Sequence, residues 1–111
     1  TEIYTLSLHD ALPISTSNLD IHHTLALMEI VAEEVRRRRK LVIAVIQDIN
    51  LAAAYCDRLI LMKDGGIVDT GKTDAVITRE NLRKVFNVTA HIYPDPYTRN
   101  IRVSFGKVKE P

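Results

Sequence analysis

The chain has 111 residues, which is enough for one small domain. Lys and Arg total 15 against 14 Asp and Glu, and the net charge of +1 argues against a protein that binds nucleic acid through a broad positive field. Hydrophobic residues make up 46%, so a folded core is expected. The single cysteine, Cys56, excludes an intramolecular disulfide framework and suits a reducing cytosol.

Residues 1–15 are predicted to be a non-native segment. Glu2–Ile14 (EIYTLSLHDALPI) is one reading frame of a widely used sequencing-library adapter, codon by codon, and chance rarely produces so long a match. The alternative is a native N-terminal arm that makes apolar contacts. We expect native sequence to begin near Ser15 or Thr16, inside a longer open reading frame, and residues 16–111 to form one domain.

A helix is predicted after a short polar stretch. Thr16–Asp20 (TSNLD) is rich in small polar residues that form loops or cap helices. The basic run Arg36–Lys40 (RRRRK) ends the helix, where cations interact favourably with the negative end of the helix dipole. Between them, apolar residues recur at helical spacing and predict one buried stripe: Ile21, Leu25, Met28, Ala32 and Val35.

A buried strand, a short helix and a hairpin are predicted next. Leu41–Ile46 (LVIAVI) is continuously apolar and rich in β-branched residues, which is typical of a strand covered on both faces in a parallel sheet. A short helix over Ile49–Tyr55 and a second buried strand over Leu59–Met62 follow. Asp64–Gly66 predicts a tight turn into a strand that begins at Ile67, which gives an antiparallel hairpin.

The last third of the chain is predicted to hold short elements. Thr73 and Thr78 can each cap a helix. Two helices and then two strands exposed on one face are expected: Asp74–Ile77, Arg79–Phe86, Thr89–Tyr93 and Ile101–Phe105. This order of elements predicts an α/β fold. Ligands in such folds collect at the carboxyl ends of strands, and Gln47 and Asp48 follow the first buried strand at that end.

Several of these segments together resemble a known family. Thr16–Asp20 (TSNLD), Gln47–Ala52 (QDINLA) and Tyr55–Gly66 (YCDRLILMKDGG) resemble the C-terminal part of an ABC-transporter ATPase. The likeness is greatest to the ATP-binding subunits of importers for iron-siderophore, haem and cobalamin. It extends from about Thr16 to Phe105, and the order of the segments is specific to ABC ATPases.

The resemblance implies roles for four polar residues. Thr16–Asp20 corresponds to the D-loop, where Asp20 would bridge to the opposite subunit of an ATP-bound dimer and Ser17 would lie at the same interface. The alternative for this stretch is an ordinary helix cap. Gln47 falls at the switch-loop position, with Asp48 beside it near the nucleotide.

Gln47 departs from the family pattern, in which this position is usually histidine. The histidine contacts the γ-phosphate and helps to hold the attacking water. Gln47 can donate an amide N–H to a phosphate oxygen, but unlike histidine it cannot take up a proton and so cannot become positively charged. The departure puts efficient hydrolysis in doubt, and the plain alternative is that Gln47 only ends a strand.

The resemblance also implies which parts are missing. The chain has no GxxxxGK[ST] phosphate loop, and no Q-loop, signature or Walker B precedes Thr16. In the resembled fold, the Walker A strand lies between the strands at Leu41–Ile46 and Leu59–Met62. We therefore expect a partial P-loop NTPase core without its central phosphate-loop strand, and either an open gap or another pairing at that place.

The implied parent protein binds ATP and Mg²⁺, pairs with a second nucleotide-binding subunit and a transmembrane permease, and lies on the cytoplasmic face of the cell membrane. It would couple ATP hydrolysis to uptake of a metal chelate. The 111-residue chain itself is expected to bind no nucleotide and to be inactive alone. No metal site and no nucleic-acid partner are expected.

Two other classes of protein stay open. One is a soluble ABC ATPase of DNA repair or translation, which would share the D-loop and switch strand but usually not the NLA…YCDR continuation. The other is a non-enzymatic interaction module that uses Arg36–Lys40 to bind nucleic acid. A run of this kind is more often a solvated helix end.

Overall fold

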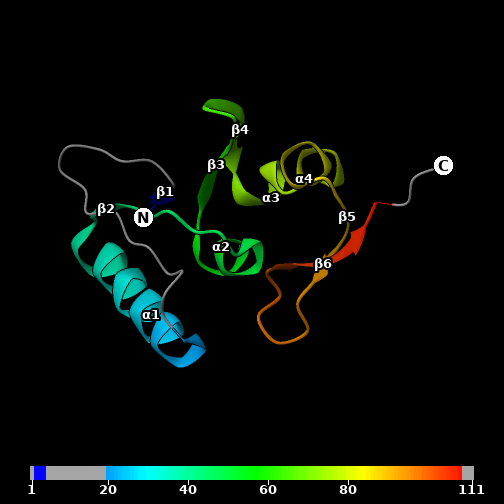
Figure 1. Ribbon diagram of the computed structural model, residues 1–111. Helices are drawn as coiled ribbons and strands as arrows, with labels where there is room; N and C mark the ends of the chain where they lie inside the picture. Colours follow the sequence, from blue (N-terminus) through cyan, green and yellow to red (C-terminus); the bar gives the residue numbers. More distant parts are fainter. Residues whose placement is uncertain (1, 5–19, 109–111) are drawn as a thin grey trace.

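The computed structural model describes residues 2–4 and 20–108. Helices and short strands alternate along the chain and confirm the predicted α/β class (Figure 1). The elements in chain order are β1 (Glu2–Tyr4), α1 (Ile21–Arg38), β2 (Leu41–Ile43), α2 (Ile49–Tyr55), β3 (Arg58–Lys63), β4 (Gly66–Lys72), α3 (Thr73–Val76), α4 (Arg79–Phe86), β5 (Val88–Pro94) and β6 (Ile101–Lys107).

Helix α1 forms where predicted, but its buried stripe is rotated. Met28 and Val35 are buried as expected, whereas Ile21 is 79% exposed and Leu25 is 43% exposed. The buried positions of α1 are Thr24, Met28, Val31 and Val35. The predicted stripe was therefore wrong at its first turns, because the helix faces the core through the row that starts at Thr24. The helix ends within the basic run, and Arg39 adopts the left-handed conformation of a C-cap (φ 51°).

Strand β2 is shorter and less covered than the apolar run predicted. Only Leu41–Ile43 is a continuous strand, and Val45 forms an isolated bridge. Ile43 and Ala44 are buried, but Leu41 is 48% and Val45 51% exposed. The expectation of a strand buried on both faces was wrong, because among the described residues no second layer covers Leu41 and Val45.

Helix α2 has the predicted bounds. Asp48 caps it by accepting hydrogen bonds from the backbone N–H groups of Asn50 (2.9 Å) and Leu51 (3.3 Å). Leu51 and Ala52 are buried on its inner side. The contacts that begin this helix are local, which is consistent with its bounds being predicted from the sequence.

The β3–β4 hairpin is confirmed. Asp64 and Gly65 both have positive φ (52° and 78°), which is the geometry of a two-residue turn that matches strand twist. Leu59 and Leu61 are buried, but Met62 is 45% exposed, so β3 buries one face rather than two. The sequence therefore overestimated the burial of this strand, as it did for β2.

The α3–α4 segment packs on this hairpin. Thr73 is the first residue of α3 rather than its cap, and its hydroxyl donates to the carbonyl of Cys56. Thr78 caps α4 as predicted by accepting from the backbone N–H of Asn81 (3.1 Å). Asn87 ends α4 in the left-handed conformation (φ 55°).

The strands form separate pairs rather than one continuous sheet. β3 pairs with β4 and β5 pairs with β6, both antiparallel, whereas β1 pairs with β2 in parallel. Strand β1 also lies close to β3 (Figure 1). Of the two expected outcomes at the edge of β2, the structure therefore shows another pairing, made by Glu2–Tyr4 with Leu41–Ile43.

Candidate functional site

A pocket lies between the start of α1, the loop before α2, helix α2 and strand β6. Its volume is about 540 Å³. Its lining residues are Ile21, Thr24, Leu25, Gln47, Asp48, Asn50, Leu51, Ala54, Tyr55 and Arg102. The pocket thus joins the helix that follows the predicted D-loop to the predicted switch residues, although these lie more than twenty positions apart in the chain.

Gln47 and Asp48 occupy the loop between the β2 region and α2. Both residues are exposed and both line the pocket. Asp48 uses one carboxylate oxygen to cap α2, so this side chain already has a structural task. The side chain of Gln47 is left as the polar group of this loop that can donate a neutral hydrogen bond to a ligand in the pocket.

Asp20 caps helix α1. Its carboxylate accepts from the backbone N–H of His23 (2.8 Å) and contacts the Nδ1 atom of the same residue (2.8 Å). These bonds, led by that from the His23 backbone, lower the pKa of the Asp20 carboxyl. Asp20 directly precedes the pocket residue Ile21. Ser17, the other predicted D-loop residue, lies outside the described residues.

Strand β6 is fixed to α2 by a reciprocal pair of hydrogen bonds. The side chain of Asn50 donates to the carbonyl of Val103 (3.0 Å), and its Oδ1 accepts from the N–H of Val103 (2.7 Å). Asn100 adds a bond to the carbonyl of Ala54 (3.3 Å). The amide of Asn50 therefore pairs with both backbone groups of Val103, as a neighbouring strand would. This pairing positions the adjacent residue Arg102, which lines the pocket.

A hydrogen bond also connects α1 to α2. The hydroxyl of Tyr55 donates to the carboxylate of Glu29 (2.8 Å). Burial, together with this bond to an anion, raises the pKa of Tyr55 to about 12, so the phenol stays protonated at neutral pH. This hydrogen bond links α1 to α2, the two helices that border the pocket.

Sequence reasoning did not identify Thr24, Tyr55 and Arg102 as pocket residues. The predicted buried stripe of α1 passed through Leu25, the neighbour of Thr24. A stripe drawn through the buried row would have included Thr24. Arg102 comes from a strand whose partner on α2 lies 53 positions earlier, and no local pattern signals such a pairing.

The described residues offer the pocket hydrogen-bond donors and one cation, but no metal cluster. No group of three or more His, Cys, Asp or Glu side chains within residues 2–4 and 20–108 is arranged to hold a metal ion. Over the same residues, no helix is long and apolar enough to cross a bilayer. A phosphate group in the pocket would find the amide of Gln47 and the guanidinium of Arg102, both of which suit an oxyanion.

Comparisons with known proteins identify relatives of the chain. It is 33% identical over 89 residues to the cobalamin import ATP-binding protein BtuD of Halobacterium salinarum. It is 36% identical over 80 residues to the hemin import ATP-binding protein HmuV of Bordetella avium and 39% identical over 84 residues to that of Hahella chejuensis. The aligned parts cover 80%, 72% and 76% of this chain. No family model matches the chain.

A solved structure has the same fold. It is an ABC transporter in an inward-facing conformation, described as of the metal-chelate type, and it matches 90% of this chain with a TM-score of 0.74 at 18% identity. The chain is homologous to the ATP-binding subunits of ABC importers. The family resemblance predicted from the sequence is therefore confirmed, as is the ABC-ATPase fold.

The chain spans only part of the length of these proteins. The match covers 22% of the Halobacterium BtuD protein, 31% and 32% of the two HmuV proteins and 39% of the chain in the solved structure. The roles of Ser17, Asp20, Gln47 and Asp48 therefore stay predictions, which the pocket makes testable.

Proposed function

We propose that this chain is the C-terminal part of the ATP-binding subunit of an importer for a metal chelate, such as an iron-siderophore, haem or cobalamin. The observation that carries the proposal is the pocket, because it joins the start of α1 to Gln47 and Asp48. The relatives named for cobalamin and hemin import support the class of cargo. The same proposal takes residues 1–15 as non-native sequence.

In the proposed parent, bound ATP with Mg²⁺ would supply the phosphoanhydride bond that is cleaved. The amide of Gln47 would donate a hydrogen bond to the terminal phosphate and help to orient water beside it. Asp48 would keep α2 and hence Gln47 in place through its cap. Asp20 and Ser17 would lie at the contact with a second nucleotide-binding subunit.

The proposal assigns the remaining catalytic parts to sequence that this chain does not hold. A phosphate cradle, a magnesium-binding aspartate and a catalytic glutamate are needed for phosphoryl transfer, and they belong to the Walker A and Walker B segments of such proteins. The parent would work on the cytoplasmic face of the cell membrane, bound to a transmembrane permease.

The DNA upstream of the codon for Thr16 tests the proposal directly. We expect an in-frame Walker B aspartate and glutamate immediately before it, a Walker A motif further upstream and a permease gene nearby. The full-length protein, reconstituted with that permease in vesicles, should take up a labelled metal chelate only when Mg-ATP is supplied. An upstream frame without Walker motifs would overturn the proposal.

A further inference from the structure

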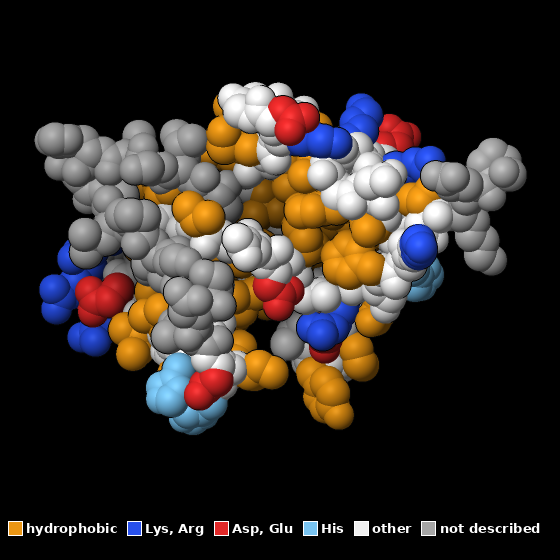
Figure 2. Space-filling view, viewed as in Figure 1, with side chains coloured by type: hydrophobic (Ala, Val, Ile, Leu, Met, Phe, Trp, Pro, Cys, Tyr) orange, Lys and Arg blue, Asp and Glu red, His pale blue; other side chains and the backbone are white. Residues whose placement is uncertain are grey.

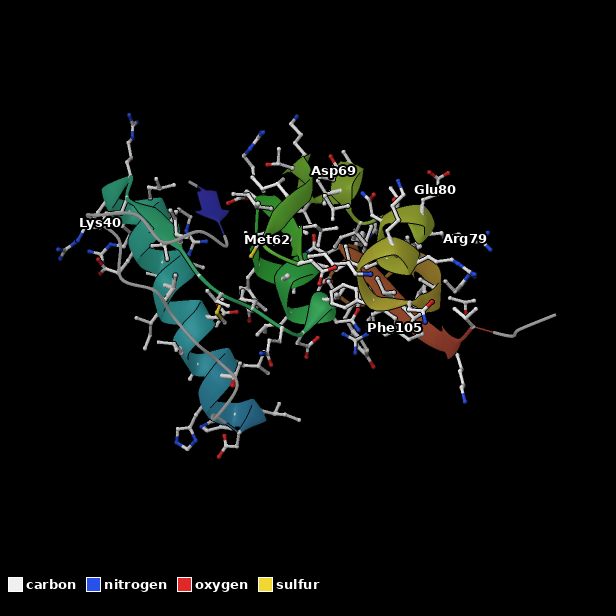
Figure 3. The ribbon with its side chains drawn as sticks, turned by 45° about the horizontal axis from the view of Figure 1, so that its top comes forward. Lys40, Met62, Asp69, Arg79, Glu80 and Phe105 are labelled. Atoms are coloured by element: carbon white, nitrogen blue, oxygen red, sulfur yellow. The ribbon has the colours of Figure 1, made fainter. Side chains whose placement is uncertain are left out.

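A second pocket lies beside α4 and the start of β5. Its volume is about 590 Å³. Its lining residues are Arg79, Glu80, Arg83, Lys84, Val88, Thr89 and Ala90. None of these residues lines the pocket that contains Gln47, so the two sites are separate. Arg79 and Glu80 project outward from α4 (Figure 3).

The charge of this pocket is mainly positive and not neutralised. Arg79, Arg83 and Lys84 face a single acid, Glu80. Within residues 2–4 and 20–108, the ion pairs are all on α1 or its cap, so none of these cations has a carboxylate partner there. The ammonium of Lys63 adds charge nearby, because it donates to the carbonyl of Lys84 (2.8 Å).

The opposite face of α4 is firmly anchored, which fixes the position of these cations. Leu82 is fully buried in the core. The side chain of Asn81 donates to the carboxylate of Asp69 (2.8 Å) and to the carbonyl of Val76 (2.8 Å), and Thr78 caps the helix. Because the helix does not need to be ordered by a ligand, its outer face can bind one at a smaller entropic cost.

The spacing of the two arginines suits oxyanions. Arg79 and Arg83 are four positions apart, so they lie on the same side of the helix. Each guanidinium has a planar set of donors that matches phosphate or carboxylate oxygens. Val88 and Ala90 make part of the wall apolar, which reduces solvent screening of a bound charge. The volume admits a ligand with more than one anionic group.

We propose that the pocket formed by α4 and β5 is a binding site for polyanions that carry phosphate or carboxylate groups. The site is independent of the proposed ATPase function. The anions can come from a small solute or from the headgroups of an acidic lipid surface, and both sources present the same chemistry to Arg79, Arg83 and Lys84.

The experiment is an NMR titration of the full 111-residue chain with inorganic pyrophosphate at constant ionic strength. We expect shifts of the Arg79, Arg83 and Thr89 signals that saturate with one dissociation constant. Arg79→Gln with Arg83→Gln should weaken binding at least tenfold. Arg36→Gln with Arg37→Gln removes the same charge from α1 and should change the constant less than twofold. Equal weakening by both pairs would overturn the site.

A gain of affinity guards against a variant that merely misfolds. Glu80→Gln removes the one acid of the pocket, so it should bind pyrophosphate severalfold more tightly, which a damaged fold does not do. Sedimentation with phosphatidylglycerol vesicles, against phosphatidylcholine vesicles, distinguishes the lipid source. Binding of either probe that depends on Arg79 and Arg83 supports the proposal, and binding of neither refutes it.

Discussion

At the predicted switch-loop position, Gln47 would contribute a neutral donor where the family resemblance implies a histidine. A hydrogen bond to a charged group contributes about 1.5–3 kcal/mol, which corresponds to roughly ten- to a hundredfold in rate if the bond forms only in the transition state. In the proposed full-length protein we therefore expect Gln47→Ala to lower turnover in that range and to change the affinity for ATP by no more than a few-fold. Gln47→His should keep or raise turnover.

Steady-state phosphate release at saturating ATP measures this difference between the three proteins. Gln47 is exposed in its loop, so the substitutions do not disturb the core. If the alanine variant turns over as fast as the glutamine protein, Gln47 only ends the strand and the predicted site is wrong.

Asp20 gives the start of α1 a pH dependence. Its pKa is lowered in the folded chain, chiefly by the N–H of His23. A lowered folded pKa means that the carboxylate stabilises the fold above its unfolded pKa of about 4 and loses this effect as pH falls through the folded pKa. Asp20→Asn should therefore be less stable than the unsubstituted 111-residue chain at pH 6, and the two stabilities should converge in acid.

Urea unfolding tests this, with circular dichroism as the readout. The range from pH 2 to pH 7 spans roughly the titration of carboxylates. Asp64→Asn is the control, because Asn is also suited to a turn position with positive φ. A difference between Asp20→Asn and the parent chain that stays constant over the whole range would contradict the prediction.

At the scale of single elements, the side chain of Asn50 fixes α2 to strand β6. Val103 is 3% exposed, and both of its backbone groups are paired by Asn50. Asn50→Ala leaves a buried donor and acceptor without partners, which costs about 1–3 kcal/mol. We expect a lower urea midpoint and faster hydrogen exchange at the Val103 amide.

Asn100→Ala is the matched control for Asn50→Ala. It removes one exposed bond of 3.3 Å between α2 and the residue just before β6, so its effect should be several times smaller. Equal effects of the two substitutions would show that Asn50 does no more than contribute surface contact.

The sequence predicted elements well where the deciding contacts are local. The bounds of α2, the turn at Asp64-Gly65 and the cap at Thr78 were each confirmed, since they depend on neighbours within a few positions. Burial was predicted less well. Leu25 and Val45 are apolar yet exposed, because burial depends on which other elements are present to cover a face.

The candidate site followed the same rule. Gln47 and Asp48 were predicted from their place after an apolar run, and both line one cavity, while their roles stay predictions. Arg102 was not found, because the bond between Asn50 and Val103 that positions it joins residues 53 positions apart. The resemblance to ABC ATPases supplied roles that the composition and spacing of the chain did not.

At the scale of the whole molecule, we predict that the 111-residue chain does not bind nucleotide at the pocket that contains Gln47. A triphosphate needs several preorganised N–H donors and a lysine. The pocket beside α2 offers Gln47 and Arg102, which are too few donors for such a ligand. Isothermal titration with Mg-ATP is carried out on the chain with Arg79→Gln and Arg83→Gln, which removes the proposed polyanion site. It should show no binding with a dissociation constant below about 1 mM, which corresponds to roughly 4 kcal/mol of binding free energy. A micromolar dissociation constant for Mg-ATP in that variant would contradict the interpretation that the phosphate-binding parts of the ATPase lie outside this chain.

An apolar groove between the segment after β2, helix α2, strand β3 and the end of α4 affects how the chain behaves in solution. It has a volume of about 460 Å³ and is lined almost entirely by hydrophobic side chains, and hydrophobic side chains are exposed across the middle of the face in Figure 2. Val45, Met62 and Phe86 line it and are 51%, 45% and 43% exposed. Beside it, β1 and β2 pair over only three residues each.

We predict that this groove makes the isolated chain associate with itself, because exposed apolar surface next to strand edges favours pairing between molecules. Met62→Glu should reduce the association by placing a charge inside the groove. Ile67→Glu is the control, since Ile67 is 60% exposed but does not line the groove. Size-exclusion chromatography with light scattering over a concentration series distinguishes the variants. A parent chain that stays monomeric and melts cooperatively above about 60 °C, high among mesophilic domains, would show that β1 already covers these strands well enough for a stable fold.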